Sequence, residues 1–302
     1  MMPRQLLIVP ALLAMCWSSA ASAQPQRQPE CVLRMETSSP SWIIRGFDPF
    51  GQTLPAATFE VTFRNDGDRA CVFQPNFVLD GESFGLSNST APRIPYTLLD
   101  ISRDVNVTPI SGQSLQRGSR GQIAVPPRSQ ILNRFLLSVT DNSIVGDGLF
   151  SQNVHLEAWS PTDMVIGARQ LTLGLDILPA ARMSLAGAFR RSNGRALVDL
   201  GVLRDGPVSL PLQLQVQSTR GYKLDFESRN QGKLRLEGTD WTVDYGMAID
   251  GQSIPLSQPY SYTASRPKST LDRLPLSFFV NGTEGKRAGI YSDTLTVSVS
   301  AY

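Results

Sequence analysis

The chain has 302 residues, of which 41% are hydrophobic and 18% are charged, and its 28 Lys and Arg residues nearly balance 26 Asp and Glu residues. A formal net charge of +2 gives no strong field for gathering nucleic acid or anionic lipid, which excludes these as the main partners. The length is sufficient for two domains of ordinary size, each with its own core.

The first 23 residues have the features of a secretory signal peptide. Arg4 precedes an apolar run over residues 6–15, and Ala21-Ser22-Ala23 provides a small-residue cleavage site. Lipid attachment at Cys16 is the weaker alternative, because Met15 stands where a small residue is expected. The apolar run is shorter than the roughly 20 residues that a membrane-spanning helix needs. We therefore expect an exported mature chain.

Two cysteines, Cys31 and Cys71, remain after this segment is removed. An even pair in an exported chain is most simply a disulfide, and a loop of about 40 residues closed in this way is stabilised by roughly 4 kcal/mol. The stretch ahead of it, residues 24–30, contains two prolines and no apolar side chain larger than proline. Such a stretch cannot complete a strand ladder.

Short segments of alternating apolar and polar residues recur along the chain, with Gly, Pro, Asn and Asp between them. This pattern predicts an all-β fold of two immunoglobulin-like, pilin-like β-sandwich domains. After the signal peptide at 1–23, we expect an N-terminal sandwich over 24–178 and a C-terminal sandwich over 179–302. The sequence Pro179-Ala-Ala-Arg182 marks the junction between them.

The two halves repeat one order of segments at similar spacing. Four pairs correspond: Phe59-Glu-Val-Thr-Phe63 with Leu212-Gln-Leu-Gln-Val216, Cys71-Val-Phe73 with Tyr222-Lys-Leu-Asp-Phe226, the segment around Tyr96 with that around Tyr245, and the segment from Phe150 to Ala158 with that from Tyr291 to Val299. The alternative is that any two β-sandwiches look alike at this level of comparison.

The halves differ after the last of these segments. The first half continues through a turn at Pro161 into Gln170-Leu-Thr-Leu-Gly-Leu-Asp-Ile-Leu178, whose apolar residues share one face of an extended segment. The second half has no such segment. We therefore expect the N-terminal sandwich to be self-complete and the C-terminal sandwich to lack its final strand.

The closing residues of the chain, 294–302, alternate apolar and polar side chains and predict a half-buried strand. Its apolar face includes Leu295, Val297 and Val299, and Tyr302 ends it. Neither Pro nor Lys interrupts the segment, so no residue in it would prevent an exposed strand edge from pairing with another strand. We predict that this edge accepts a strand from another chain.

No cluster of residues has the pattern of a catalytic, cofactor or metal site. His155 lies in an alternating strand, and no group of His, Cys and carboxylate residues has the spacing of metal ligands. Two of Asp141, Asp147 and Asp163 could form the carboxylate pair of a glycosidase, because sequence does not reveal the distance between them. Roles as polar turn residues explain all three more simply. We predict that the protein is not an enzyme and binds no cofactor.

Two loops of the first half are candidates for ligand contact, since rigid strands position variable loops. Phe84 and Leu86 interrupt an otherwise polar stretch at 81–90, and Leu149 lies in the stretch Gly146-Asp-Gly-Leu-Phe150. Apolar side chains exposed there would suit adhesion. The alternative that all three pack beneath their own loops stays open.

These features resemble the spore coat protein U family, the subunits of archaic and related chaperone-usher pili. The resemblance covers most of the mature chain, and five motifs carry it besides the Tyr96 and Tyr245 segments: Gly46-Phe-Asp-Pro-Phe50, Val198-Asp-Leu-Gly-Val-Leu-Arg-Asp-Gly206, Ser218-Thr-Arg-Gly-Tyr222, Ser228-Arg-Asn-Gln-Gly232 and Ala288-Gly-Ile-Tyr-Ser-Asp-Thr-Leu-Thr-Val-Ser-Val299. The last motif is the most specific.

The resemblance implies a function as well as a fold. In this family a periplasmic chaperone lends the missing strand, and an adjacent subunit later replaces it as an outer-membrane usher exports the fibre to the cell surface. Because residues 24–30 cannot serve as a donor, the chain is expected at the end of the fibre, as a pilus tip adhesin acting in cell adhesion and biofilm formation. The alternatives are a structural coat or shaft subunit, or a secreted carbohydrate-active enzyme with a β-sandwich binding module.

Overall fold

The computed structural model describes residues 30–81, 83–88, 92–109, 121–139, 146–265 and 270–302. The signal peptide and residues 24–29 lie outside these ranges. β-Strands dominate the described ranges, which contain no α-helix, so the prediction of an all-β fold is confirmed. Within the same ranges no helix is long and apolar enough to cross a membrane.

The N-terminal half folds into two sheets around one core. Its strands are β1 (Leu33–Thr37), β2 (Ser41–Phe47), β3 (Ala56–Asn65), β4 (Cys71–Leu79), β5 (Tyr96–Asp100), β6 (Val105–Asn106), β7 (Ile123–Val125), β8 (Gln130–Val139), β9 (Gly148–Trp159) and β10 (Val165–Ile177). One sheet has the order β1-β3-β8-β5-β6 and the other β2-β10-β9-β4-β7. Trp42, Phe63, Phe135 and Phe150 are among the largest fully buried side chains between them.

The C-terminal half forms a separate core. Its strands are β11 (Ala181–Gly187), β12 (Arg190–Ser192), β13 (Arg195–Leu197), β14 (Gly206–Ser218), β15 (Tyr222–Ser228), β16 (Lys233–Leu236), β17 (Thr242–Ile249), β18 (Gln252–Ile254), β19 (Tyr260–Ala264), β20 (Thr270–Asn281), β21 (Tyr291–Ser292) and β22 (Leu295–Ala301). The larger sheet has the order β11-β14-β20-β17-β16-β21, the smaller β19-β15-β22, and β12 and β13 form a separate hairpin. Val216, Leu224 and Phe226 are buried between the two larger sheets.

The alternating sequence pattern explains why these segments are strands. In β8, Asn133, Phe135, Leu137 and Val139 are buried while the residues between them face outward. Successive side chains of a strand point to opposite faces, so a period of two fixes which face enters the core. The amino-acid pattern therefore determines both the strand and its orientation.

The expected disulfide between Cys31 and Cys71 is confirmed. It joins the segment ahead of β1 to the start of β4, with a Cα–Cα distance of 5.1 Å and a sequence separation of 40 residues. Cys71 is fully buried in the N-terminal core. The bridge therefore constrains the N-terminal half alone.

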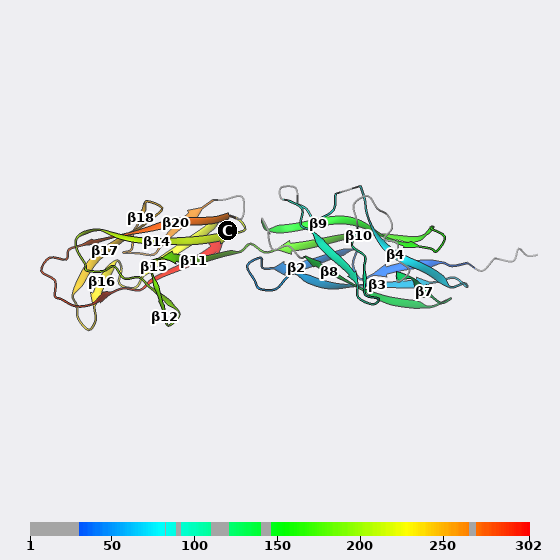
Figure 1. Cartoon of the computed structure of the whole chain (residues 1–302), viewed down its shortest axis with the longest axis horizontal. Helices are drawn as coiled ribbons and strands as arrows, with labels where there is room; N and C mark the ends of the chain where they lie inside the picture. The colour runs from blue at the N-terminus through cyan, green and yellow to red at the C-terminus, as the bar shows by residue number, and fades with distance from the viewer. Residues whose placement is uncertain (1–29, 82, 89–91, 110–120, 140–145, 266–269) are drawn as a thin grey trace, which may run out of the picture.

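The two halves lie end to end, and residues 178–180 connect β10 to β11 directly (Figure 1). Side-chain contacts cross the junction: Arg220 donates to Asp147, and the guanidinium of Arg182 lies 5.1 Å from the centre of the Phe50 ring. The domain boundary between residues 178 and 179 stays a prediction.

The strand partners agree with the expected repetition of the two halves. β3, β8 and β5 are neighbours in the first half, as β14, β20 and β17 are in the second. β4 pairs with β9 as β15 pairs with β22. β10 has no counterpart after β22 among the described residues.

Candidate functional site

β22 lies at the edge of its sheet. It pairs antiparallel with β15, from Leu295 opposite Ser228 to Ala301 opposite Tyr222. Among the described residues no strand pairs with its other side. The backbone N–H and C=O groups on that side offer a template for another strand.

The apolar face of β22 is only half covered. Leu295, Val297 and Val299 are partly buried and pack against the C-terminal core. In β9, which holds the same position in the N-terminal half, Val154 and Leu156 are fully buried. Part of the apolar surface that the first half removes from water therefore stays exposed in the second.

β10 accounts for this difference. It pairs antiparallel with β9 and parallel with β2, and its residues Leu171, Leu173, Leu175 and Ile177 are at most 1% exposed. In the C-terminal half, β11 lies next to β22 without pairing with it, and β11 is itself the last strand of the larger sheet. We call the place between these two neighbouring edges, both unpaired on that side among the described residues, the gap; it corresponds to the position where the first half holds β10.

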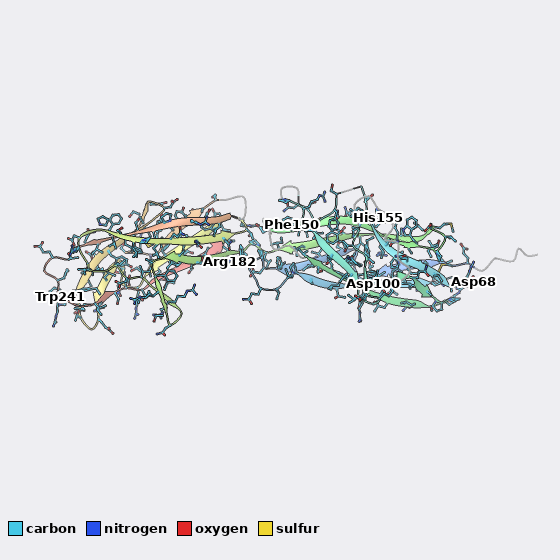
Figure 2. All side chains as sticks on the ribbon, in the orientation of Figure 1. Asp68, Asp100, Phe150, His155, Arg182 and Trp241 are labelled. Atoms are coloured by element: carbon cyan, nitrogen blue, oxygen red, sulfur yellow. A yellow bond between two sulfur atoms is a disulfide. The ribbon has the colours of Figure 1, made fainter. Side chains whose placement is uncertain are left out.

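The gap opens into a cavity of about 550 Å³ at the end nearest the N-terminal half. Its lining comes from the linker, from the start of β11 (including Ala181), from the end of β22 (including Val299), and from Asp48 and Phe50 of the other half. Figure 2 labels Arg182 and Phe150 at this junction and Asp68 at the opposite end of the N-terminal half.

Tyr302, which we expected to belong to the open edge, lies just beyond β22. Its backbone N–H donates to Gly221 O over 3.0 Å, and its hydroxyl lies 2.9 Å from Ser265 Oγ. These bonds continue the contact with β15, not with the open side. Leu295, Val297 and Val299 are the predicted residues that the structure brings together along the gap.

Asp293 fixes the start of β22, a role that sequence reasoning missed. Its Oδ2 accepts hydrogen bonds from Ser228 Oγ at 2.5 Å and Tyr245 Oη at 2.7 Å. Its Oδ1 accepts from the backbone N–H groups of Asn230 at 2.9 Å and Thr294 at 2.7 Å. Burial raises the pKa of Tyr245 well above its usual value of 10.0, and the bond to Asp293 raises it further.

The N-terminal half has the same arrangement with a neutral residue. Tyr96 Oη donates to Gln152 Oε1 at 2.9 Å, and the N–H of Gly85 donates to the same oxygen at 3.1 Å. Gln152 and Asp293 occupy the same place in the repeated segments. The role of Asp293 could therefore have been inferred from the sequence, because Asp293 corresponds to Gln152 in the repeated segments as Tyr245 corresponds to Tyr96.

The structure does not place the predicted loop residues at one exposed surface. Leu86 is fully buried, and the Phe84 ring packs on Tyr96 with 4.8 Å between ring centres. Of the two alternatives, packing beneath the loop therefore describes Leu86, and Phe84 is partly buried against the N-terminal core. Leu149 is 48% exposed. It lies two residues from Asp147, which pairs with Arg220 at the junction between the halves, and so it is not at the free end of the N-terminal half.

The candidate catalytic residues do not converge. Nε2 of His155 lies 3.3 Å from Asp80, Asp147 pairs with Arg220, and Asp163 has a turn conformation with φ of 56°. Asp141 lies outside the described residues. Within the described ranges no group of three His, Cys, Asp or Glu residues could hold a metal ion.

The fold and the gap define a protein with two β-sandwich halves, one closed by its own strand and one with an unpaired edge. No protein-family model matches the chain. No curated protein matches it either.

Several solved structures have a similar arrangement of strands. A chain of the CsuC-CsuE chaperone-tip adhesion subunit pre-assembly complex, from archaic chaperone-usher Csu pili of Acinetobacter baumannii, is 12% identical with a TM-score of 0.48, covering 88% of this chain and 100% of that one. The CupB6 tip adhesin from Pseudomonas aeruginosa is 13% identical with a TM-score of 0.41, covering 90% and 94%. A point mutant of the CFA/I adhesin CfaE from enterotoxigenic E. coli is 10% identical with a TM-score of 0.36, covering 87% and 91%.

Proposed function

We propose that this protein is a non-enzymatic subunit of a surface fibre, and that its C-terminal half accepts a strand from another chain. One observation carries the proposal: within the described residues β22 is unpaired on one side and its apolar face is only partly buried, whereas β9 in the same position is covered by β10. Strand addition at such an edge combines backbone hydrogen bonds with alternating side-chain pockets.

The resemblance to the spore coat protein U family supplies the assembly route of this proposal. A periplasmic chaperone would hold the open half first, an outer-membrane usher would export it, and an adjacent subunit would donate the permanent strand. The signal-peptide features of residues 1–23 support export toward the cell surface.

The position proposed for the subunit is the tip of a chaperone-usher pilus, where the N-terminal half acts as the adhesin. Two features support this position: the N-terminal half already contains its own closing strand, β10, and residues 24–30 lack the apolar side chains that a donor strand needs.

The experiment that tests strand acceptance uses the chain's own closing strand. The protein is extended after Tyr302 by a copy of residues 161–177, with leucine in place of Arg169. The copied residues 161–164 form the turn, and the copied β10 then runs back along β22. Burying four or five large apolar side chains is worth roughly 6 to 15 kcal/mol before ordering costs. The extended protein should be more soluble, and its C-terminal half should unfold at higher denaturant concentration.

A matched extension carries serine in place of the copied Leu171, Leu173 and Leu175. It has the same length and backbone, so it should give neither effect. The proposal would be abandoned if the unextended protein proved to be a stable monomer whose C-terminal half gained nothing from either extension.

A further inference from the structure

The direction of an incoming strand follows from the internal comparison. β10 begins beside the end of β9, with Val165 opposite Trp159, and runs back to place Ile177 opposite Gly148. A strand that fills the equivalent gap runs antiparallel to β22 and parallel to β11. Its first residues then lie in the cavity at the junction, beside Val299 and Ala301.

The N-terminal half uses a glycine at this end of its closing strand. Gly167 lies opposite Ala158, and a Cβ atom added there would lie 3.3 Å from Cε of Met35 and 3.6 Å from Cδ2 of Leu33. Both contacts come from β1. A side chain at this position would therefore be tightly packed, because Met35 and Leu33 of β1 already occupy the adjoining space.

The C-terminal half keeps one of these two side chains, since Met183 pairs with Val216 as Met35 pairs with Phe63, and lacks the other. Ala158 corresponds to Val299 in the repeated segments. Leu33 corresponds to Ala181 because the two hold the same place in their sheets. Leu33 pairs with Asn65, the last residue of β3, and Ala181 pairs with Ser218, the last residue of β14. Alanine in place of leucine removes three carbon atoms from the wall. The cavity of about 550 Å³ lies at this point and includes both Ala181 and Val299 in its lining.

We propose that the strand accepted by the C-terminal half carries a large apolar side chain opposite Val299, seated against Ala181 at the junction. This inference rests on the proposed function and adds its specificity: the partner is an extended segment whose first inward-facing residue is bulky. Because Asp48 and Phe50 line the same cavity, the N-terminal half also contacts the captured strand.

The test uses the full mature protein and two synthetic peptides. Both copy the 13 residues of β10 with leucine in place of Arg169, and they differ only in carrying glycine or leucine at the position of Gly167. Filling the cavity with a leucine side chain should make the leucine peptide at least about tenfold tighter in a titration. Amide exchange over residues 46–51, the end of β2 and the turn after it, should slow in that complex.

The variant Ala181→Leu restores the wall found in the N-terminal half and should abolish the preference for the leucine peptide. Ala196→Leu makes the same change on the exposed hairpin β12–β13 and should leave the preference intact. Equal affinity for the two peptides, or unchanged exchange at 46–51, would overturn the inference while leaving strand acceptance standing. Binding of neither peptide would count against both the inference and the proposed function.

Discussion

At the scale of single residues, Asp293 links the loop after β15 to the start of β22. Its two carboxylate oxygens accept bonds from two hydroxyls and two backbone N–H groups. Gln152 holds the matching loop of the N-terminal half through one oxygen shared by Tyr96 and Gly85. The carboxylate therefore fixes where the open strand begins.

Removal of the Tyr245 hydroxyl should weaken this connection. A buried hydrogen bond to a charged acceptor is worth about 1.5 to 3 kcal/mol, and Tyr245→Phe should lower the free energy of unfolding of the C-terminal half by that amount or less. Urea unfolding with amide exchange assigned to each half measures it. Tyr260→Phe is the matched control, because that hydroxyl accepts an exposed bond from Gln252; an equal effect of both variants would contradict the prediction.

The same tyrosine predicts a dependence of stability on pH. Burial and the bond to Asp293 raise the pKa of Tyr245 above 10.0, so the unfolded chain loses this proton at lower pH than the folded chain. The resulting stability is complete below about pH 10 and is lost as the pH rises above it. Unfolding of the C-terminal half followed from pH 8 to 11 should show this decline, and Tyr245→Phe should reduce its slope. An unchanged slope would show that other groups cause it.

At the scale of elements, the decisive comparison is between β22 and β9. Both alternate apolar and polar residues, but β10 covers β9 on the side where β22 is unpaired among the described residues. The side chains of Leu295, Val297 and Val299 are therefore only partly buried, and the proposed partner strand would cover them. A substitution on this face should affect binding more than the same substitution on the outer face.

Val297→Asp should abolish capture of the leucine peptide and leave the N-terminal half unchanged, because a captured strand would bury an unpaired carboxylate. Ser298→Asp places the same charge on the exposed face of β22 and should bind the peptide as the parent does. Val297→Thr keeps the side-chain shape and separates lost binding from lost folding; a loss of about fivefold or more is expected. Tight binding by all three variants would remove β22 from the site.

The strands and their repetition in the two halves could be predicted from the sequence, because the alternation of apolar and polar residues is a local pattern. The sequence also predicted the disulfide and the missing counterpart of β10. It did not predict the partners of Asp293 or the room beside Ala181, and it left the burial of Phe84 and Leu86 as one of two alternatives, since each depends on which side chains a fold brings together from distant segments. Loop residues such as Phe84 have no periodic neighbours from which their burial could be inferred.

At the scale of the whole molecule, the two cores share no residue, and the single disulfide lies in the first. Among the described residues, the side-chain contacts named between the halves are the ion pair of Arg220 with Asp147, whose side chains are 43% and 9% exposed, and the contact of Arg182 with the Phe50 ring. Neither contact joins the two cores. The halves are therefore expected to unfold separately.

Reduction of the bond between Cys31 and Cys71 should destabilise the N-terminal half by roughly 4 kcal/mol and leave the C-terminal half unchanged. Urea unfolding with and without a reductant, followed by amide exchange in each half, measures both values. Cys31→Ser with Cys71→Ser should reproduce the effect of the reductant. A parallel loss in both halves would show that they fold as one unit.

The direct passage from β10 through residues 178–180 into β11 also has a mechanical consequence. A pull along the long axis of the molecule would load β10 lengthwise between β9 and β2, so that the hydrogen bonds of both ladders resist together instead of opening one at a time. A strand captured between β11 and β22 would be loaded in the same way. Tension applied to such a chain would pass from one half to the other through strands held in shear.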